Sequence, residues 1–275
     1  MSPRALLTGA TGFLGARLAR TLEDSGWVVT VLGRAQGVGE IAGTVRRAQP
    51  DVTLHLATEF RPEHAPDDIE PMIAANVLFG TQLLESLRTV SLARVVTVGT
   101  HWQHYENAGY SPVSLYAATK QAFDDIARYY ADVAGFHFVH LDVTDCYGPG
   151  DTRGKLLSLL CNAAREGTLL DLSPGEQRID LLHVDDAVNA LLVAARRLLD
   201  GAGQPVERWA VRTGRSLTIR EVVELFERVR GVTLRVRWGA RPYRARETFA
   251  AWTEGSTLPG WVPHIPLERG LLTLD

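Results

Sequence analysis

The chain has 275 residues and a mass of 30.2 kDa, which suits one large α/β domain or one domain with a small additional lobe. Hydrophobic residues make up 45% and charged residues 22%, as in globular proteins, so disorder and a fibrous architecture are excluded. A formal net charge of −3 and a pI near 6.3 leave no basic field for nucleic acid and no polybasic membrane signal.

The first half of the chain alternates predicted strands with predicted helices. Residues 4–8 form a short apolar run that ends at Gly9, which is typical of a buried strand, and Gly26 ends the helical stripe that follows. The predicted strands are residues 4–8, 28–32, 51–56, 94–98 and 136–143, and the predicted helices are 13–25, 40–48, 72–90 and 115–134. This alternation predicts an α/β fold with a doubly wound parallel (Rossmann) sheet.

The regular alternation of predicted strands and helices is less clear after Gly148-Pro149-Gly150. We expect helices over residues 155–165 and 184–199, short strands over 169–172 and 178–182, and a helix from the capping box at Thr218 to about Gly231. The proline-rich tail beyond it is expected to be irregular. We therefore predict a Rossmann domain over 1–150 and a smaller C-terminal, mainly substrate-binding lobe over 151–275, with helix 184–199 returning to the Rossmann domain.

Cysteine content and hydropathy favour a cytoplasmic protein. Cys146 and Cys161 are too few for a disulfide framework. No apolar run approaches the roughly 20 residues that cross a bilayer, and the N-terminus leads into a predicted strand without a signal-peptide pattern. We expect no membrane and no nucleic-acid partner.

The segment Thr8-Gly9-Ala10-Thr11-Gly12-Phe13-Leu14-Gly15 spaces glycines by three between a predicted strand and a predicted helix. Bare backbone N–H groups at the positive end of a helix bind a pyrophosphate, and glycine lets the phosphate approach closely. The alternative is an ordinary glycine-rich turn. The strand–turn–helix context favours dinucleotide binding.

The end of the second strand indicates which dinucleotide is bound. Arg34 stands where sites for NAD usually place an acid that accepts from the ribose hydroxyls. An arginine there can pair with a 2′-phosphate, so we predict NADPH as the cofactor, with NAD less favoured. The alternative is a solvated arginine in an arginine-rich chain.

The pair Tyr116 and Lys120 is four residues apart at the start of a predicted helix, which places both side chains on one face. An ammonium beside a phenol lowers the phenol's pKa, so we expect Tyr116 to donate a proton to a forming alkoxide. Only two of the 29 basic residues are lysines, Lys120 and Lys155, which argues that neither is merely a solvent-exposed surface residue. Thr100 follows a strand end and can hold a carbonyl oxygen; otherwise it only caps a turn.

These motifs stand in the order of the extended short-chain dehydrogenase/reductase family, which the whole chain resembles. The matching segments are Thr8 to Gly15, Leu56-Ala57-Thr58, Asn76, Thr100, Tyr116/Lys120, Tyr147-Gly148-Pro149 and His183-Val184-Asp185-Asp186. The stretches 99–104, 115–121 and 147–155 are similar to nucleotide-diphosphate-sugar 4-ketoreductases, relatives of CDP-abequose synthase and of reductases that make antibiotic deoxysugars.

The resemblance implies a set of site residues. The catalytic residues would be Thr100, Tyr116 and Lys120. Cofactor contacts would come from Gly9, Thr11, Gly12, Phe13, Leu14, Gly15, Arg34, Leu56, Ala57, Thr58, Asn76, Val98, Tyr116, Lys120 and Val143. Substrate contacts would come from His101, Trp102, Asp145, Arg153, Lys155, Arg178 and Arg244, with Arg178 as the best diphosphate ligand. No metal site is predicted, because no carboxylate or cysteine lies at ligand spacing from His101 and His104.

Three departures from the family's pattern stand out. Residues 34–51 are short and lack a clear strand carrying the Asp that many members place against adenine. Asp145 stands where many relatives have Asn. His101-Trp102 follows Thr100, whereas 4,6-dehydratases have an Asp-Glu pair there, and water elimination needs an acid and a base.

The sequence therefore predicts NADPH-dependent reduction of the C4 keto group of a nucleotide-activated, preferentially dTDP-linked, 4-keto-6-deoxyhexose. The alternatives are a nucleotide-sugar 4-epimerase, which uses the same residues, and a non-catalytic NADP-binding sensor, against which the intact catalytic set speaks. The sequence does not predict the base of the nucleotide, the substituents at C2 and C3 of the sugar, or the face of the sugar that the hydride attacks. Helices 72–90 and 115–134 offer a homodimer interface of four helices, in the manner of the family.

Overall fold

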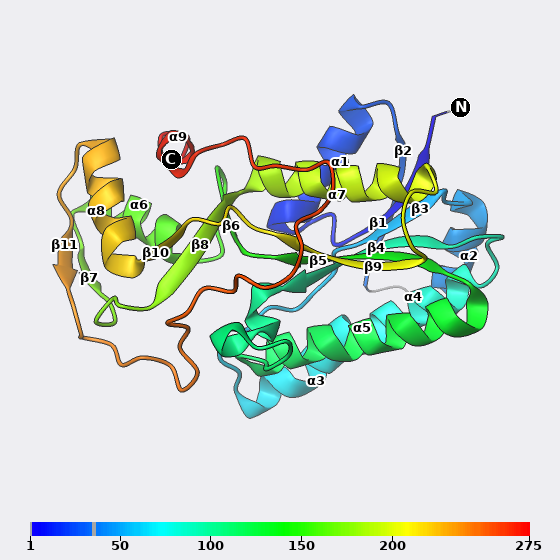
Figure 1. Cartoon of the computed structure of the whole chain (residues 1–275), viewed down its shortest axis with the longest axis horizontal. Coiled ribbons are helices and arrows are strands. Elements are labelled where there is room, and N and C mark those ends of the chain that lie inside the picture. The colour runs from blue at the N-terminus through cyan, green and yellow to red at the C-terminus, as the bar shows by residue number, and fades with distance from the viewer. Residues whose placement is uncertain (1, 35–36) are drawn as a thin grey trace.

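The computed structural model describes residues 2–34 and 37–275. Six strands form one parallel sheet in the order β2-β1-β3-β4-β5-β9, which confirms the predicted doubly wound fold (Figure 1). These strands are β1 (Arg4–Thr8), β2 (Val28–Leu32), β3 (Val52–His55), β4 (Arg94–Thr100), β5 (His137–Val143) and β9 (Val206–Val211). The central strands β3, β4 and β5 are buried along nearly their whole length, as expected for a sheet that is covered on both faces.

Helices cover both faces of this sheet. Helices α1 (Phe13–Asp24) and α7 (Val184–Leu199) share one hydrophobic core with it, whereas α2 (Val38–Ala48), α4 (Phe79–Leu87) and α5 (Leu115–Ala134) share another on the opposite face. The contacts of α7 with α1, β4 and β5 place this helix on the central sheet. The division of function at residue 150 stays a prediction.

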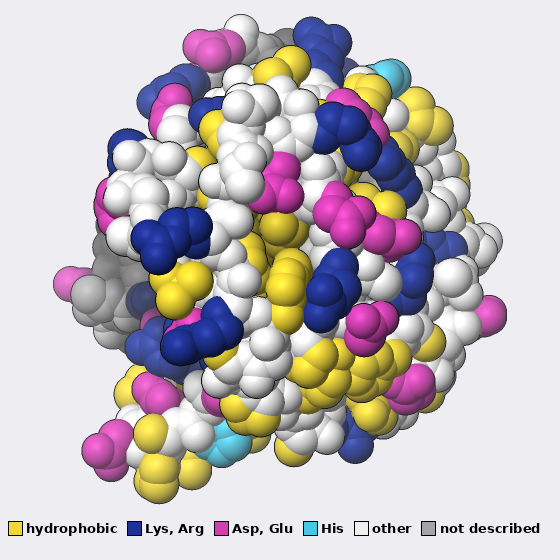
Figure 2. Space-filling view, turned by 90° about the vertical axis from the view of Figure 1, so that its left-hand side faces the viewer, with side chains coloured by type: hydrophobic (Ala, Val, Ile, Leu, Met, Phe, Trp, Pro, Cys, Tyr) yellow, Lys and Arg dark blue, Asp and Glu magenta, His cyan; other side chains and the backbone are white. Residues whose placement is uncertain are grey.

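A smaller lobe follows β5. Its strands are β6 (Asp145–Tyr147), β7 (Leu169–Asp171), β8 (Arg178–His183), β10 (Ser216–Thr218) and β11 (Arg235–Arg237), and its helices are α6 (Leu156–Glu166), α8 (Ile219–Arg230) and α9 (Leu267–Leu271). The three helices and Tyr147 pack into a third core. Figure 2 shows the face at this end of the molecule, where acidic and basic side chains are intermingled, as the small net charge implies.

The structure differs from the sequence expectation in several places, among them the short strands β6 and β10, which were not predicted. Strand β9 was not predicted, because its Glu207 and Arg208 suggest solvent; in the structure both are paired with charged partners. The predicted helix over residues 72–90 is α3 (Ile69–Ile73), a π-helical turn (Ala74–Leu78) and α4. The tail that was expected to be irregular contains β11 and the short α9.

Most of that tail is a strap, residues 240–266, that runs from the small lobe across the Rossmann part (Figure 1). Its Arg246 donates to Ser111 Oγ at 2.5 Å, and its Trp252 stacks on His104 with 4.2 Å between ring centroids. The strap therefore ties the two parts of the chain together.

Within the described ranges, no helix has the length and apolar character needed to span a bilayer. Cys146 and Cys161 are both buried and unpaired. The cytoplasmic location stays a prediction.

The far end of the strap is clamped by Asp186, in the first turn of α7. Its carboxylate, 3% exposed, accepts the backbone N–H groups of His264 at 2.9 Å and Ile265 at 3.0 Å. The indole N–H of Trp261 donates to the Asp186 backbone oxygen at 3.0 Å. The Asp186 carboxylate therefore binds two successive backbone donors of the strap.

We predict that Asp186→Ala lowers the free energy of unfolding by about 2–4 kcal/mol, because two charge-assisted hydrogen bonds from a buried carboxylate are lost. The neighbouring Asp185 is the matched control: its side chain is 44% exposed in an ion pair with Arg17. Asp185→Ala should therefore cost about 1 kcal/mol or less. Urea unfolding of both variants measures the difference. Equal losses of unfolding free energy would show that the Asp186 hydrogen bonds to the strap do not stabilise the fold.

Candidate functional site

The turn from β1 into α1 is shaped to hold an anion. Gly9 has a φ of +74°, a conformation that favours glycine, and its carbonyl oxygen accepts the Gly12 N–H at 3.0 Å. Helix α1 has no capping side chain and no acid in its first turn. Its first N–H groups are thus left for a bound phosphate, which also gains from the helix dipole.

Glycines are needed in this turn because backbones meet there. A Cβ on Gly15 would lie 2.0 Å from the Gly9 oxygen, and a Cβ on Gly9 would lie 2.6 Å from the Ala57 nitrogen. Thr8 Oγ1 accepts the N–H groups of Leu56 at 3.2 Å and Ala57 at 3.1 Å. The glycine-rich turn and the loop after β3 are therefore fixed against each other.

A cavity of about 670 Å³ opens over this turn and extends along the carboxyl ends of β1, β3, β4 and β5. Its wall holds most of the predicted cofactor and catalytic residues, namely Gly9, Thr11, Gly12, Phe13, Leu14, Gly15, Leu56, Thr58, Val98, Thr100, Tyr116, Lys120 and Val143. Such a cavity has the size and the phosphate cradle that a dinucleotide needs. Arg34, Ala57 and Asn76 are not part of the wall.

Asn76 lies behind the wall, in the π-helical turn, and is 2% exposed. Its Oδ1 accepts from Glu59 N–H at 2.6 Å and from Thr58 Oγ1 at 3.0 Å, while its Nδ2 donates to Thr119 Oγ1 at 2.9 Å. Asn76 thus holds the loop after β3 against α5.

Arg34 has an acidic neighbour, contrary to the sequence expectation. Its Nη1 lies 3.4 Å from Glu59 Oε2, and Arg61 contacts the same carboxylate at 2.9 Å. Glu59 follows a different strand, so adjacency to Arg34 could not be seen in the sequence. The residues just after Arg34, 35 and 36, lie outside the described residues.

Tyr116 and Lys120 lie in the first turns of α5, which Ser114 caps by accepting the Ala117 N–H at 3.4 Å. Thr100, at the end of β4, is 8% exposed, and its Oγ1 accepts the Trp102 N–H at 3.3 Å. All three catalytic candidates line the same cavity. The structure therefore brings the three candidates to one cavity, and their catalytic roles stay a prediction.

The expectation that the pKa of Tyr116 is lowered was wrong. Burial raises the pKa of Tyr116 to about 12, with Thr58 and Arg153 acting in the opposite direction. Burial also lowers the pKa of Lys120 to about 8, against the opposing effect of Asp124 and Asp142. Removal from water outweighs neighbouring charge in both groups.

A second cavity of about 700 Å³ adjoins the first and extends into the small lobe. The two cavities share Phe60, His101, Trp102, Asp145, Cys146, Arg153 and Lys155. In the shared wall, Asp145 pairs with Lys155 Nζ at 2.7 Å and with His101 Nε2 at 3.3 Å. These neighbours hold the pKa of Asp145 down, at about 2, despite burial, so the wall contains a fixed carboxylate.

The predicted arginines divide between two places. Arg153 lies in the shared wall, with its guanidinium 4.3 Å from the centre of the Phe13 ring. Of these two cavities, Arg178 and Arg244 line the second and not the first. Arg178 donates to Ser216 Oγ at 3.0 Å, and Arg244 stacks 4.8 Å over Trp102.

Sequence reasoning missed Phe60, which lies in the shared wall and meets the Tyr116 ring edge-on at 5.0 Å. It stands in a loop without periodicity, so only its place just after Leu56-Ala57-Thr58 offered a signal. Among the described residues, no group of three or more His, Cys, Asp or Glu side chains is placed to hold a metal ion.

Known proteins resemble the chain over nearly its full length. CDP-abequose synthase of Salmonella muenchen is 24% identical, with 98% of this chain and 96% of the relative covered. UDP-glucose 4-epimerase of Mycolicibacterium smegmatis is 27% identical over 80% of each.

Solved structures share the fold. MoeE5 in complex with UDP-glucuronic acid and NAD superposes with a TM-score of 0.86 at 24% identity, covering 98% of this chain and 97% of that one. UDP-glucose 4-epimerase of Thermus thermophilus in complex with NAD gives 0.82 at 22% identity, with 98% and 97% covered. Residues 5–206 match the NAD dependent epimerase/dehydratase family. The chain therefore belongs to that family, which confirms the predicted family resemblance and an NAD(P)-dependent enzyme.

Proposed function

We propose that the protein is an NADPH-dependent reductase of the C4 keto group of a nucleotide-activated 4-keto-6-deoxyhexose, preferentially a dTDP-linked one. The observation that carries this proposal is the meeting of the two cavities at the wall next to Thr100 and Tyr116. A dinucleotide in the first cavity and a sugar nucleotide in the second would bring their reacting ends together there. The likeness to CDP-abequose synthase supports a reductase of a nucleotide sugar.

Each catalytic residue has a chemical task in this reaction. A bound NADPH would supply the hydride to C4 of the sugar. The phenol of Tyr116, with a pKa near 12, is protonated at neutral pH, as a proton donor to the new C4 oxygen must be. Because Thr100 Oγ1 already accepts from the Trp102 N–H, its own O–H is available to the carbonyl oxygen. The ammonium of Lys120 stabilises negative charge that develops at the phenol.

The second cavity supplies the contacts for the sugar nucleotide. The fixed carboxylate of Asp145, with His101 and Lys155, would accept from and donate to sugar hydroxyls in the shared wall. Trp102 offers an apolar face for a 6-deoxy carbon. Arg178, Arg244 and the shared Arg153 are the cations for the diphosphate.

A 4-epimerase is the second candidate, because UDP-glucose 4-epimerases are among the similar proteins and the similar structures hold NAD. Incubation with NADPH and a nucleotide-linked 4-keto-6-deoxyhexose separates the two. The reductase consumes NADPH in equal amount to the 4-hydroxy sugar formed. An epimerase interconverts nucleotide hexoses with no net consumption, and a protein that only binds NADPH turns over neither.

A homodimer through α3–α4 and α5 stays a prediction. These helices expose apolar side chains: Ile73 is 42%, Leu78 51%, Tyr129 59% and Val133 55% exposed. Sedimentation velocity on the purified protein would show whether they are covered by a second copy.

We predict that Tyr116→Phe lowers kcat roughly 100- to 10,000-fold, because a positioned general acid is lost. Cofactor affinity should stay within a few-fold, since the ring remains. Tyr110→Phe, at a side chain that is 50% exposed, is the control and should retain full activity. Steady-state kinetics with fluorescence titration of NADPH tests this, and a folded Tyr116→Phe enzyme with normal kcat would remove Tyr116 from the chemistry.

We predict that Arg178→Ala raises KM for the sugar nucleotide roughly ten- to hundredfold while KM for NADPH hardly changes. The diphosphate is remote from C4, so the lost contact weakens binding before and during reaction alike. Arg220, 41% exposed and outside both cavities, provides the matched Arg220→Ala control. Parallel increases in both KM values would make Arg178 a structural residue.

We predict that the wild-type enzyme binds NADPH more tightly than NADH and that Arg34→Asp reverses this order. The guanidinium attracts a 2′-phosphate, whereas an aspartate repels it and accepts from a bare ribose. Glu59→Gln should strengthen NADPH binding by up to about fivefold, because the acid that contacts Arg34 loses its charge. Calorimetric titrations with NADPH and NADH measure both affinities. An unchanged preference for NADPH over NADH in both variants would show that Arg34 is only a solvated arginine.

A further inference from the structure

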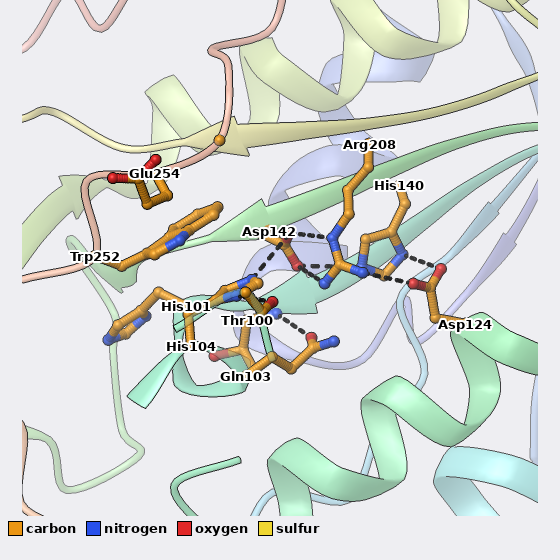
Figure 3. A network of polar contacts seen from close by, with 12 residues as sticks. Thr100, His101, Gln103, His104, Asp124, His140, Asp142, Arg208, Trp252 and Glu254 are labelled. Atoms are coloured by element: carbon orange, nitrogen blue, oxygen red, sulfur yellow. Dashed lines mark hydrogen bonds and ion pairs between the residues drawn. The ribbon is translucent and has the colours of Figure 1, made fainter. Parts of the chain in front are cut away.

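A buried polar cluster lies behind the end of β4, outside both cavities (Figure 3). We call it the acid cluster; it consists of His104, Asp124, His140, Asp142 and Arg208. Its members come from the turn after β4, from α5, from β5 and from β9. Asp124, His140, Asp142 and Arg208 were not predicted as site residues.

Asp142 is the centre of the acid cluster, and its side chain is 1% exposed. Arg208 donates to both of its oxygens, with Nε 2.6 Å from Oδ2 and Nη2 3.0 Å from Oδ1. His140 Nε2 lies 3.2 Å from Oδ1, and His104 Nε2 lies 3.4 Å from Oδ2. These contacts hold the pKa of Asp142 far below its ordinary value, so the residue is a permanent buried anion.

Asp124 is the second acid of the cluster. Its Oδ2 lies 2.7 Å from Arg208 Nη1, and its Oδ1 lies 3.2 Å from His140 Nδ1. One arginine therefore serves two carboxylates. The acid cluster thus has two carboxyl groups for one guanidinium, and His104 and His140 also contact the two acids.

Lys120 is a further cation close to these two carboxyl groups. Asp124 follows Lys120 by four residues on α5, so both lie on the face that packs against β4 and β5. Lys120 is 5% exposed, and no carboxylate among residues 2–34 and 37–275 forms a direct ion pair with it. Burial disfavours the charged form of such an ammonium.

The other groups near Lys120 do not supply negative charge. His55 on β3 is neutral, because burial and Lys120 lower its pKa to about 3. The Tyr116 phenol, one turn earlier on α5, is uncharged at neutral pH. On β9, Arg208 is a competing cation. The two acids are thus the groups that favour the charged form of Lys120.

We propose that Asp142 and Asp124, clamped together by Arg208, are positioning residues that keep the Lys120 ammonium charged at the catalytic end of the sheet without touching cofactor or substrate. The role of Lys120 in catalysis rests on the proposed function, whereas its charge does not.

The same cluster also packs against the backbone that presents Thr100. Gly99 is the register partner of Asp142, and a Cβ there would lie 2.4 Å from Asp142 Oδ1 and 2.2 Å from His140 Nε2. Gln103, fully buried, accepts the Thr100 N–H at 2.9 Å and donates to Gln121 beside Lys120 at 3.0 Å. The carboxylates therefore have a fixed position relative to the strand end.

The chain allows a direct test, because Lys120 and Lys155 are its only lysines. In protein labelled with ¹³C at lysine Cε, an NMR pH titration gives two side-chain midpoints, assigned with Lys155→Arg. We expect a Lys120 midpoint near 8 in the wild type. Asp142→Asn removes a negative charge, disfavours the ammonium and should lower this midpoint by roughly one pH unit. Asp124→Asn should lower it in the same direction.

Glu207→Gln is the matched control, since it also removes a buried carboxylate from an arginine pair on β9. Glu207 is bound to Arg197 at 2.6 Å, and its register partner is Val139, toward the opposite end of β5 from Val143. This variant should lose stability but keep the Lys120 midpoint.

An unchanged midpoint in folded Asp142→Asn overturns the proposal, as does an equal shift in Glu207→Gln. If Asp142→Asn does not fold, Asp124→Asn decides alone, because its side chain is 21% exposed and less embedded. The titration needs no substrate. A shifted midpoint in an enzyme that reduces no keto sugar therefore defeats the proposed function and leaves this proposal standing.

Discussion

The structure depends on one geometric constraint: parallel strands of a sheet all end at the same edge. Strands β1, β3, β4 and β5 run in the same direction, so the phosphate-binding turn, the loop after β3, Thr100 and Val143 meet there. Helix α5 is packed against β4 and β5 and adds Tyr116 and Lys120 to the same edge. The small lobe begins directly after β5, which lets the second cavity open onto the first.

Concentrating polar groups at a buried edge requires that their charges be compensated. The shared wall does so with Asp145 held between Lys155 and His101, and the layer behind it does so with Asp142 and Asp124 around Arg208. Burial raises the pKa of Tyr116 and lowers that of Lys120, so both groups are shifted toward their neutral forms. A neutral phenol suits proton donation, whereas we propose that the charge of Lys120 depends on Asp142 and Asp124.

Local patterns predicted the fold and much of the site. The glycine spacing at Gly9 to Gly15 and the pair Tyr116 and Lys120 depend on contiguous residues, and the structure places them in one cavity. Strand β9 escaped prediction because the partners of Glu207 and Arg208 are distant in sequence. The contact of Glu59 with Arg34 joins two strands and could not be seen either. Burial, which sets the Tyr116 pKa, is a property of the assembled fold.

The central claim is that hydride passes from the first cavity to C4 of a sugar in the second. Reaction with NADPH carrying deuterium at the transferable C4 position, followed by NMR of the sugar nucleotide product, tests it most directly. The account predicts that the deuterium appears at C4 of the sugar, one atom for each NADPH oxidised. Oxidation of NADPH without deuterium in the sugar, or deuterium at another sugar carbon, would contradict it.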